Sequence, residues 1–290
     1  ARSRDRAVGG SLMRWRLAAS VAIALAMPAG AARAAGLPRM VSMNVCTDQL
    51  LLTLADPEQI IGLSRFSRDG WQSLSGNDMN RCPVLSGGAE DVGRAKPDIV
   101  VASLFDNRST RELLKAKGLH LAELAVPRTL AEARAQIREA GDITGHPDRA
   151  VAEIARLDAA LARAKVAATQ RHYRVLPLSR RGWVAGSDSF IGSLLTETGL
   201  LNAAGDLGFT FGGFASLEAI VSLRPDFIVV SQAGNHASDD GQAFLLHPAL
   251  ERFYPPAKRI VIPERMTECG GVMLADALDA LTAELKRVRK

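Results

Sequence analysis

The sequence predicts an α/β fold with two similar lobes of parallel-sheet βαβ units, joined by one long rigid helix, with a ligand cleft between the lobes. The first observation behind this prediction is an internal repeat: EDVGRAKPDIVVAS, starting at Glu90, returns in outline as EAIVSLRPDFIVVS, starting at Glu218. Its period is too long for a solenoid, whose repeats are about 20–50 residues, so it indicates two globular halves. The second is the alternation of predicted strands with helices, which is typical of parallel sheets. The third is an alanine-rich helical segment between the halves.

Strands and helices are predicted in the same order in both halves. In the first half, apolar and β-branched runs predict strands at residues 39–44, 60–63, 98–102 and 119–124, with helices at 48–54 and 111–117. The second half has strands at 173–178, 227–230 and 259–262, a helix at 189–198 and a closing helix at 272–288. In the repeated segments, short helices are expected at 90–95 and 218–223, because a residue that precedes proline avoids the helical conformation.

Between the halves, residues 147–170 place Val151, Ile154, Leu157 and Leu161 at helical spacing. A helix of this length is about 36 Å long and restricts hinge opening between two lobes. The alternative is an ordinary packing helix of one lobe. The predicted domains are therefore an N-terminal lobe at 35–145, a connecting helix at 146–171 and a C-terminal lobe at 172–290.

The N-terminal 34 residues have the layout of a secretory signal peptide. Arg14 and Arg16 precede an apolar run at 17–27, and Ala32-Arg33-Ala34 provides small residues where a signal peptidase cleaves. The run is shorter than the roughly 20 residues that span a membrane. Residues 1–12 precede Met13 and are interpreted as lying upstream of the true start. Because residues 1–34 hold six arginines and one aspartate, they account for the whole net charge of +5, which argues against nucleic-acid binding.

Three cysteines follow the predicted signal peptide: Cys46, Cys82 and Cys269. An oxidising compartment permits one disulfide and leaves one thiol, and all three pairings are open. Cys46–Cys269 would tie the two lobes together, whereas Cys46–Cys82 would lie within the first lobe. No Cys or His spacing indicates a zinc site.

Export, duplicated α/β lobes, a helical connector and the paired E-x6-P-D segments together resemble the periplasmic substrate-binding proteins of ABC importers for ferric siderophores and vitamin B12. The resemblance extends over residues 39–285. It implies a monomeric periplasmic protein that binds a small metal chelate in a shallow cleft and has no cofactor of its own. It also implies that Glu90 and Glu218 dock onto arginines of an ABC permease dimer in the inner membrane. An acidic residue in the first turn of a surface helix suits this role.

Ligand contacts are expected from loops at the carboxyl ends of the strands, where open parallel sheets bind ligands. The candidates are Cys46, Asp48, Arg65, Phe66, Trp71, Arg180, Arg181, Trp183, Phe211, Phe214, Arg265 and Met266. Aromatic faces with several arginines favour an anionic iron chelate, a ferric siderophore or related complex, and cobalamin is the alternative. Haem usually requires an axial His or Tyr, for which His236 in a polar loop is a candidate. Scattered histidines argue against direct binding of a free metal ion.

A secreted α/β enzyme with Cys46 as nucleophile is a more distant alternative. Such chemistry needs a thiolate of lowered pKa and an orienting third group, and the sequence indicates neither. It also contains no G-x-S-x-G, Walker or G-x-G-x-x-G motif. We therefore expect a binding protein and no catalysis.

Overall fold

The computed structural model describes residues 36–68, 82–168, 172–231 and 240–288. The expected signal peptide, together with Trp71 and His236, lies outside these residues. Within the described ranges, no helix has the length and apolar character needed to cross a membrane. Residues Gly36–Lys290 belong to one compact unit.

The first lobe is built on a parallel sheet with the strand order β2-β1-β3-β4. Its strands are β1 (Met40–Ser42), β2 (Ile60–Gly62), β3 (Ile99–Ser103) and β4 (Leu121–Leu124). The helices are α1 (Val45–Leu54), α2 (Ala89–Ala95), α3 (Arg108–Ala116) and α4 (Leu130–Thr144). Each predicted strand of this half is present, although the sequence analysis did not predict α4.

The second lobe repeats this topology, because its parallel sheet has the corresponding order β7-β5-β9-β10. Its strands are β5 (Arg174–Pro177), β7 (Leu201–Asn202), β9 (Phe227–Val230) and β10 (Arg259–Val261). The helices are α6 (Phe190–Glu197), α7 (Leu217–Leu223), α8 (Asp240–Ala243), α9 (Pro248–Phe253) and α10 (Leu274–Arg287). An antiparallel pair, β6 (Trp183–Ala185) and β8 (Gly212–Phe214), distinguishes this lobe from the first and was not predicted. The two-lobed α/β fold is confirmed.

The Pro-Asp pairs of the internal repeat hold equivalent positions in the two sheets. Asp98 accepts a hydrogen bond from the backbone N–H of Arg39, just before β1, at 2.8 Å. Asp226 accepts the same bond from Arg174, at the start of β5, also at 2.8 Å. In each lobe the aspartate therefore ties the amino end of the central strand pair, which explains why the segment recurs.

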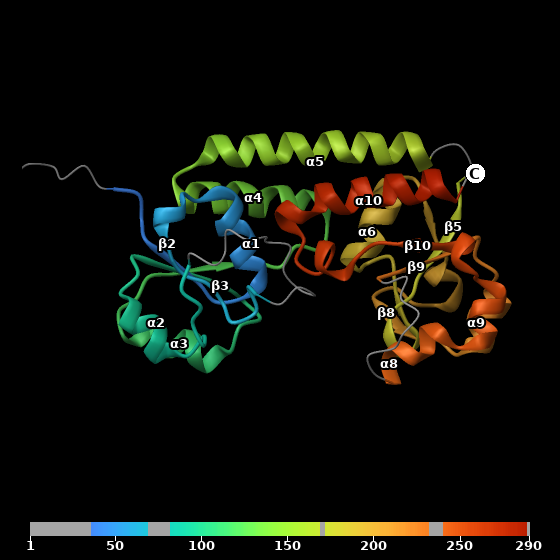
Figure 1. Cartoon of the computed structure of the whole chain (residues 1–290), viewed down its shortest axis with the longest axis horizontal. Helices are drawn as coiled ribbons and strands as arrows, with labels where there is room; N and C mark the ends of the chain where they lie inside the picture. Colours follow the sequence, from blue (N-terminus) through green and yellow to red (C-terminus); the bar gives the residue numbers. More distant parts are fainter. Residues whose placement is uncertain (1–35, 69–81, 169–171, 232–239, 289–290) are drawn as a thin grey trace, which may run out of the picture. The chain divides into compact units, whose positions relative to one another are not determined.

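The connecting helix α5 (Pro147–Ala168) packs against α4 and α10 (Figure 1). Its first part contributes Leu157 to the core of the first lobe, and its end contributes Ala167 to the core beneath the second sheet. The alternative of a helix that packs on one lobe therefore does not describe α5. Helix α10 also serves both lobes, since Leu274 lies in the first core and Leu285 in the second.

Ion pairs fix α5 against α10 along this shared seam. Arg156 donates to the Asp276 carboxylate at 3.0 Å and to the Val272 carbonyl at 2.7 Å. Arg163 makes two bonds of 2.9 Å to Asp279. The bidentate geometry orients the helices, while burial of apolar side chains provides most of the stability.

Truncation of Leu157 to alanine is expected to destabilise the protein by about 2–5 kcal/mol, because the side chain is fully buried and leaves a cavity. Val151 on the same helix is 65% exposed, so Val151→Ala is a matched control that should change the free energy of unfolding by less than about 0.5 kcal/mol. Urea unfolding followed by circular dichroism measures both values. Equal effects of the two substitutions would contradict the placement of α5 on the core.

Candidate ligand-binding site

A cavity of about 320 Å³ opens at the carboxyl edge of the second sheet. Residues at the ends of β5, β9 and β10 line it, together with β6, the start of α6 and residues from the segment 264–268. This is the edge at which open parallel sheets place their ligands, because the strand-to-helix loops converge there. The volume is at the lower end of the range for small-molecule sites, so it suits one part of a large ligand.

Aromatic side chains contribute to the lining of this cavity. Trp183 of β6 lines it and packs edge-to-face on Phe214 of β8, with ring centroids 5.0 Å apart. A Cβ added to Gly212 would lie 2.6 Å from the Trp183 ring, so only glycine fits at this point of β8. The sequence did not predict the β6–β8 pair. This pair holds the Trp183 ring in place at the cavity.

The polar part of the lining comes from hydroxyl and carboxylate side chains. Ser179 and Ser231 follow β5 and β9, and Glu264, Thr267 and Glu268 follow β10. Within the described part of the chain, no arginine, lysine, histidine or tyrosine lines the cavity. The described lining thus offers carboxylate acceptors and hydroxyl groups beside ring surfaces, with no cation among these residues.

The carboxyl edge of the first sheet presents a second group of exposed side chains. Leu104 and Phe105 directly follow β3 and are 55% and 81% exposed. The buried Arg111 fixes their loop by donating to the Leu104 and Asp106 carbonyls, both at 3.2 Å. Phe105 was not among our candidates, although its place directly after a repeated strand was a usable signal.

A disulfide between Cys46 and Cys269 joins the two edges, with the Cα atoms 5.0 Å apart. Cys46 lies in the first turn of α1, and Cys269 follows the cavity residue Glu268. This pairing is one of the three that the sequence left open, and it leaves Cys82 as a buried thiol whose pKa is raised by burial and by the nearby Asp48. Because Cys46 is oxidised, the alternative of a Cys46 nucleophile has no free thiol.

The two lobes also approach each other closely at Gly270. A Cβ at this position would lie 2.6 Å from Pro127, which follows β4, and 3.7 Å from the Phe190 ring of α6. Gly270 has a φ of 65°, in the left-handed region that favours glycine. The chain thus places a glycine next to the disulfide, where the loops of both lobes meet.

The other predicted ligand residues are either exposed on the segments around β6 and β8 or half-buried in the turn after β10. Phe211 and Phe214 are 65% and 66% exposed on the segment that contains β8. Arg180 and Arg181 belong to the short 3₁₀ turn that precedes Trp183, and both are exposed. Arg265 and Met266 belong to the 3₁₀ turn Glu264–Met266 and are half-buried, with Met266 packed against the second core. These residues therefore border the cavity without lining it.

Asp48 is buried instead of facing the ligand edge. Its carboxylate accepts hydrogen bonds from the backbone N–H of Ser64 at 2.9 Å and from the Ser64 hydroxyl at 2.5 Å. Burial raises the pKa of Asp48 above its ordinary value. The hydrogen bonds from Ser42 and Ser64 act in the opposite direction and lower this pKa. Near it, Arg65 stacks over Phe66, with the guanidinium 4.6 Å from the ring centroid.

The tyrosines and most histidines lie away from the cavity. Tyr254 is 3% exposed, and burial raises its pKa to about 12, while Tyr173 packs edge-to-face on Phe227. His146 contacts Asp56, and His247 accepts from the first turn of α9. Among the described residues, no group of three or more His, Cys, Asp or Glu side chains is arranged to hold a metal ion.

The family model described as "Periplasmic binding protein" matches residues 40–259. The chain belongs to this family. The curated relatives include a cobalamin-binding protein of Halobacterium salinarum strain R1, 25% identical over 225 residues, which are 74% of this chain and 59% of the relative. The chain thus spans less than two thirds of that relative.

Solved structures of similar fold include two periplasmic haem-binding proteins. RhuT from Roseiflexus sp. RS-1 aligns with a TM-score of 0.69 and 22% identity, over 88% of this chain and 100% of that protein. HutB of Vibrio cholerae aligns with a TM-score of 0.71 and 18% identity, over 84% of this chain and 97% of that protein. At this identity, the likeness shows the fold shared by these binding proteins.

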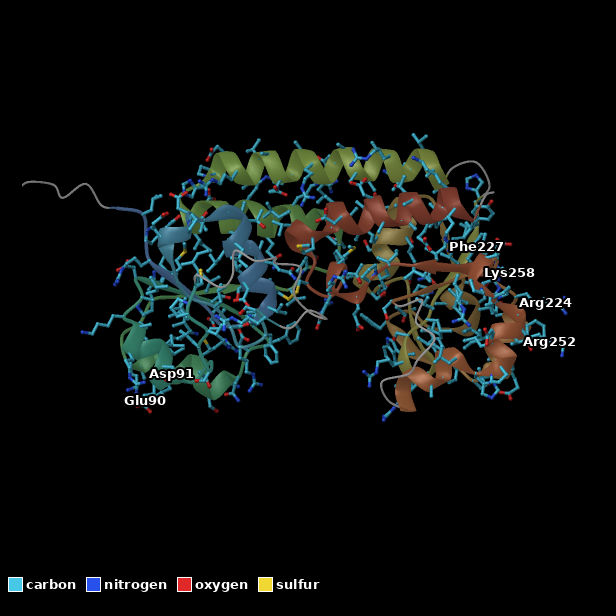
Figure 2. All side chains as sticks on the ribbon, in the orientation of Figure 1. Glu90, Asp91, Arg224, Phe227, Arg252 and Lys258 are labelled. Carbon is cyan, nitrogen blue, oxygen red and sulfur yellow. A yellow bond between two sulfur atoms is a disulfide. The ribbon has the colours of Figure 1, made fainter. Side chains whose placement is uncertain are left out.

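In this periplasmic binding protein, the repeated glutamates occupy equivalent places in the first turns of α2 and α7, and both are exposed. Figure 2 shows Glu90 beside Asp91 on α2. Glu90 pairs with Arg94 one turn later at 2.8 Å. Hydrogen bonds from its own backbone N–H and from Ser216 hold the pKa of Glu218 below its ordinary value, so the group is ionised at neutral pH.

The disulfide predicts a defined thiol count. Denatured protein kept oxidised should react with one equivalent of Ellman's reagent, from Cys82, and reduced protein with three. A tryptic map under oxidising conditions should contain a crosslinked peptide pair with Cys46 and Cys269, which reduction separates. Three thiols without reduction, or a crosslink to Cys82, would contradict this arrangement.

Proposed function

We propose that this chain is the substrate-binding component of an ABC importer, works as a periplasmic monomer and captures a metal chelate, of which cobalamin is the favoured candidate. The observation that carries the proposal is the cavity at the carboxyl edge of the second sheet, whose lining combines the ring of Trp183 with the carboxylates of Glu264 and Glu268. Rings pack against a flat macrocycle, and carboxylates and hydroxyls accept hydrogen bonds from peripheral amides. Cobalamin is rich in such amides.

On the basis of the cavity lining, we place cobalamin before the anionic iron chelate that the sequence favoured. Arginines on the ligand loops favoured an anionic iron chelate, but Glu264 and Glu268 line the cavity, while Arg265 lies between them without lining it. Carboxylates repel the anionic groups of a siderophore and suit amide donors. The curated relative whose name states that it binds cobalamin agrees with this order. A ferric siderophore remains the second candidate, supported by the arginines that border the cavity.

Haem is less well supported by the described residues. A haem-binding site usually supplies an axial His or Tyr. Tyr173 and Tyr254 are packed into the protein, and none of the described histidines lines the cavity. The haem-binding neighbours are similar to this chain in fold.

Delivery of the ligand rests on the two exposed glutamates. A carboxylate in the first turn of a helix is stabilised by the helix dipole and can form a bidentate pair with a partner's guanidinium. Because α2 and α7 hold equivalent places in two repeated lobes, Glu90 and Glu218 suit a permease dimer with two-fold symmetry. The binding protein supplies recognition, and the permease complex hydrolyses ATP.

Isothermal titration calorimetry with cyanocobalamin, ferric hydroxamates, ferric catecholates and haem tests the ligand. We expect saturable cyanocobalamin binding, and we expect Trp183→Ala to weaken it about tenfold or more, because a buried aromatic face contributes about 2 kcal/mol. Phe253→Ala, at an exposed position on α9, is the control and should leave affinity unchanged. Binding of a ferric siderophore alone would overturn the order of ligands, and no binding would overturn the proposal.

Charge reversal at both docking residues tests transport. Glu90→Arg with Glu218→Arg should leave ligand affinity unchanged and abolish cellular uptake, because arginine would face the permease's arginines. Glu139→Arg, an exposed change on α4, is the matched control and should transport normally. Uptake of radiolabelled ligand at the normal level in the double variant would rule out docking through α2 and α7.

A further inference from the structure

The first turn of α1 carries a buried carboxylate that no cation of the described residues compensates. Asp48 is fully buried, and the groups that act on its charge are Ser42, Ser64 and a second carboxylate, Asp106. No lysine, arginine or histidine among the described residues is one of the groups that act on the Asp48 carboxylate. Holding a charge with neutral donors alone is energetically expensive and is typical of residues kept for function.

Besides a hydrogen bond from Ser42 at the end of β1, Asp48 binds the turn that follows β2. Both carboxylate oxygens bind Ser64, through its backbone N–H at 2.9 Å and its hydroxyl at 2.5 Å. The Ser64 hydroxyl in turn accepts from the backbone N–H of Phe66 at 3.3 Å, and the Ser64 carbonyl accepts from Ser67 at 3.1 Å. Asp48 therefore fixes the conformation of residues 64–67.

This turn displays a cation on the ligand edge of the first lobe. Arg65 is exposed, and its guanidinium lies 4.6 Å from the centroid of the half-buried Phe66 ring. The stacking restricts the direction of the guanidinium, so less rotamer entropy is lost when it binds an anion. The cavity of the second lobe provides no such cation among its described lining residues.

The same turn of α1 is joined to the cavity by the disulfide. Cys46 lies two positions before Asp48 and is bonded to Cys269, which follows the cavity residue Glu268. One helical turn therefore holds two ligand-edge loops: the disulfide fixes the loop after β10, and Asp48 fixes the loop after β2.

We infer that Asp48 is a positioning residue that holds Arg65 and Phe66 toward an anionic group of the bound chelate. For cobalamin, the anionic group is the phosphate of the nucleotide loop, and the macrocycle rests against the rings of the second lobe. The inference rests on the proposed function. It assigns recognition of the ligand's anionic group to Arg65 in the first lobe and packing against the macrocycle to the rings of the second lobe.

Two corrinoids test whether Asp48 and Arg65 act on the phosphate and not on the macrocycle. Cyanocobalamin contains the nucleotide phosphate and dicyanocobinamide lacks it. Asp48→Ala and Arg65→Gln should each weaken cyanocobalamin binding about tenfold, since a charge-assisted contact is lost, and should change dicyanocobinamide binding less than about twofold. The double variant should bind cyanocobalamin as weakly as Asp48→Ala alone, because both changes remove one contact. Asp98→Ala, at the opposite edge of the same sheet, is the control and should leave both affinities unchanged.

A second measurement needs no ligand. Brief trypsin treatment of the folded protein should cleave after Arg65 faster in Asp48→Ala and Ser64→Ala than in the wild type, because the turn loses its anchor. Equal cleavage, or equal weakening of both corrinoids, would overturn the inference. A wild type that binds neither corrinoid would overturn the assignment of cobalamin, while the cleavage rates would still show whether Asp48 holds the turn.

Discussion

The seam between α5 and α10 is the constraint on which the rest of the structure depends. Each helix contributes buried side chains to the cores of both lobes, as Leu157 and Ala167 do in α5. Arg156 and Arg163 fix the two helices against each other, and the Cys46–Cys269 disulfide joins the lobes at the ligand edges. The carboxyl edges of the two sheets are therefore aligned before ligand arrives, which reduces the ordering cost of binding.

Repetition of one topology gives the two lobes equivalent surfaces with different chemistry. Asp98 and Asp226 make the same bond in both lobes, and Glu90 and Glu218 occupy the same helical turn. The ligand edges of the described residues diverge, because the second lobe adds the β6–β8 pair with the packed rings of Trp183 and Phe214. The symmetry suits the proposed docking onto a permease dimer, and the asymmetry suits a ligand whose two ends differ.

Much of the fold followed from local patterns. The repeat, the proline-limited helices and the apolar spacing around Leu157 predicted the two sheets and α5, because these signals lie within short windows. The sequence did not reveal α10 entering the first core, the Cys46–Cys269 pairing or the burial of Asp48, since each depends on contacts between distant segments. Trp183, a candidate from its loop position, lines the cavity, whereas Phe105 was not among the candidates and the candidate Asp48 is buried.

Hydrogen–deuterium exchange of the protein with and without saturating cyanocobalamin tests the central claim, that both ligand edges form one site. The account predicts slower exchange in the loops after β1, β2 and β3 of the first lobe and in 179–189 and 264–268 of the second, with α5 unchanged. Protection confined to one lobe, or spread along α5, would contradict a shared site held by a rigid seam.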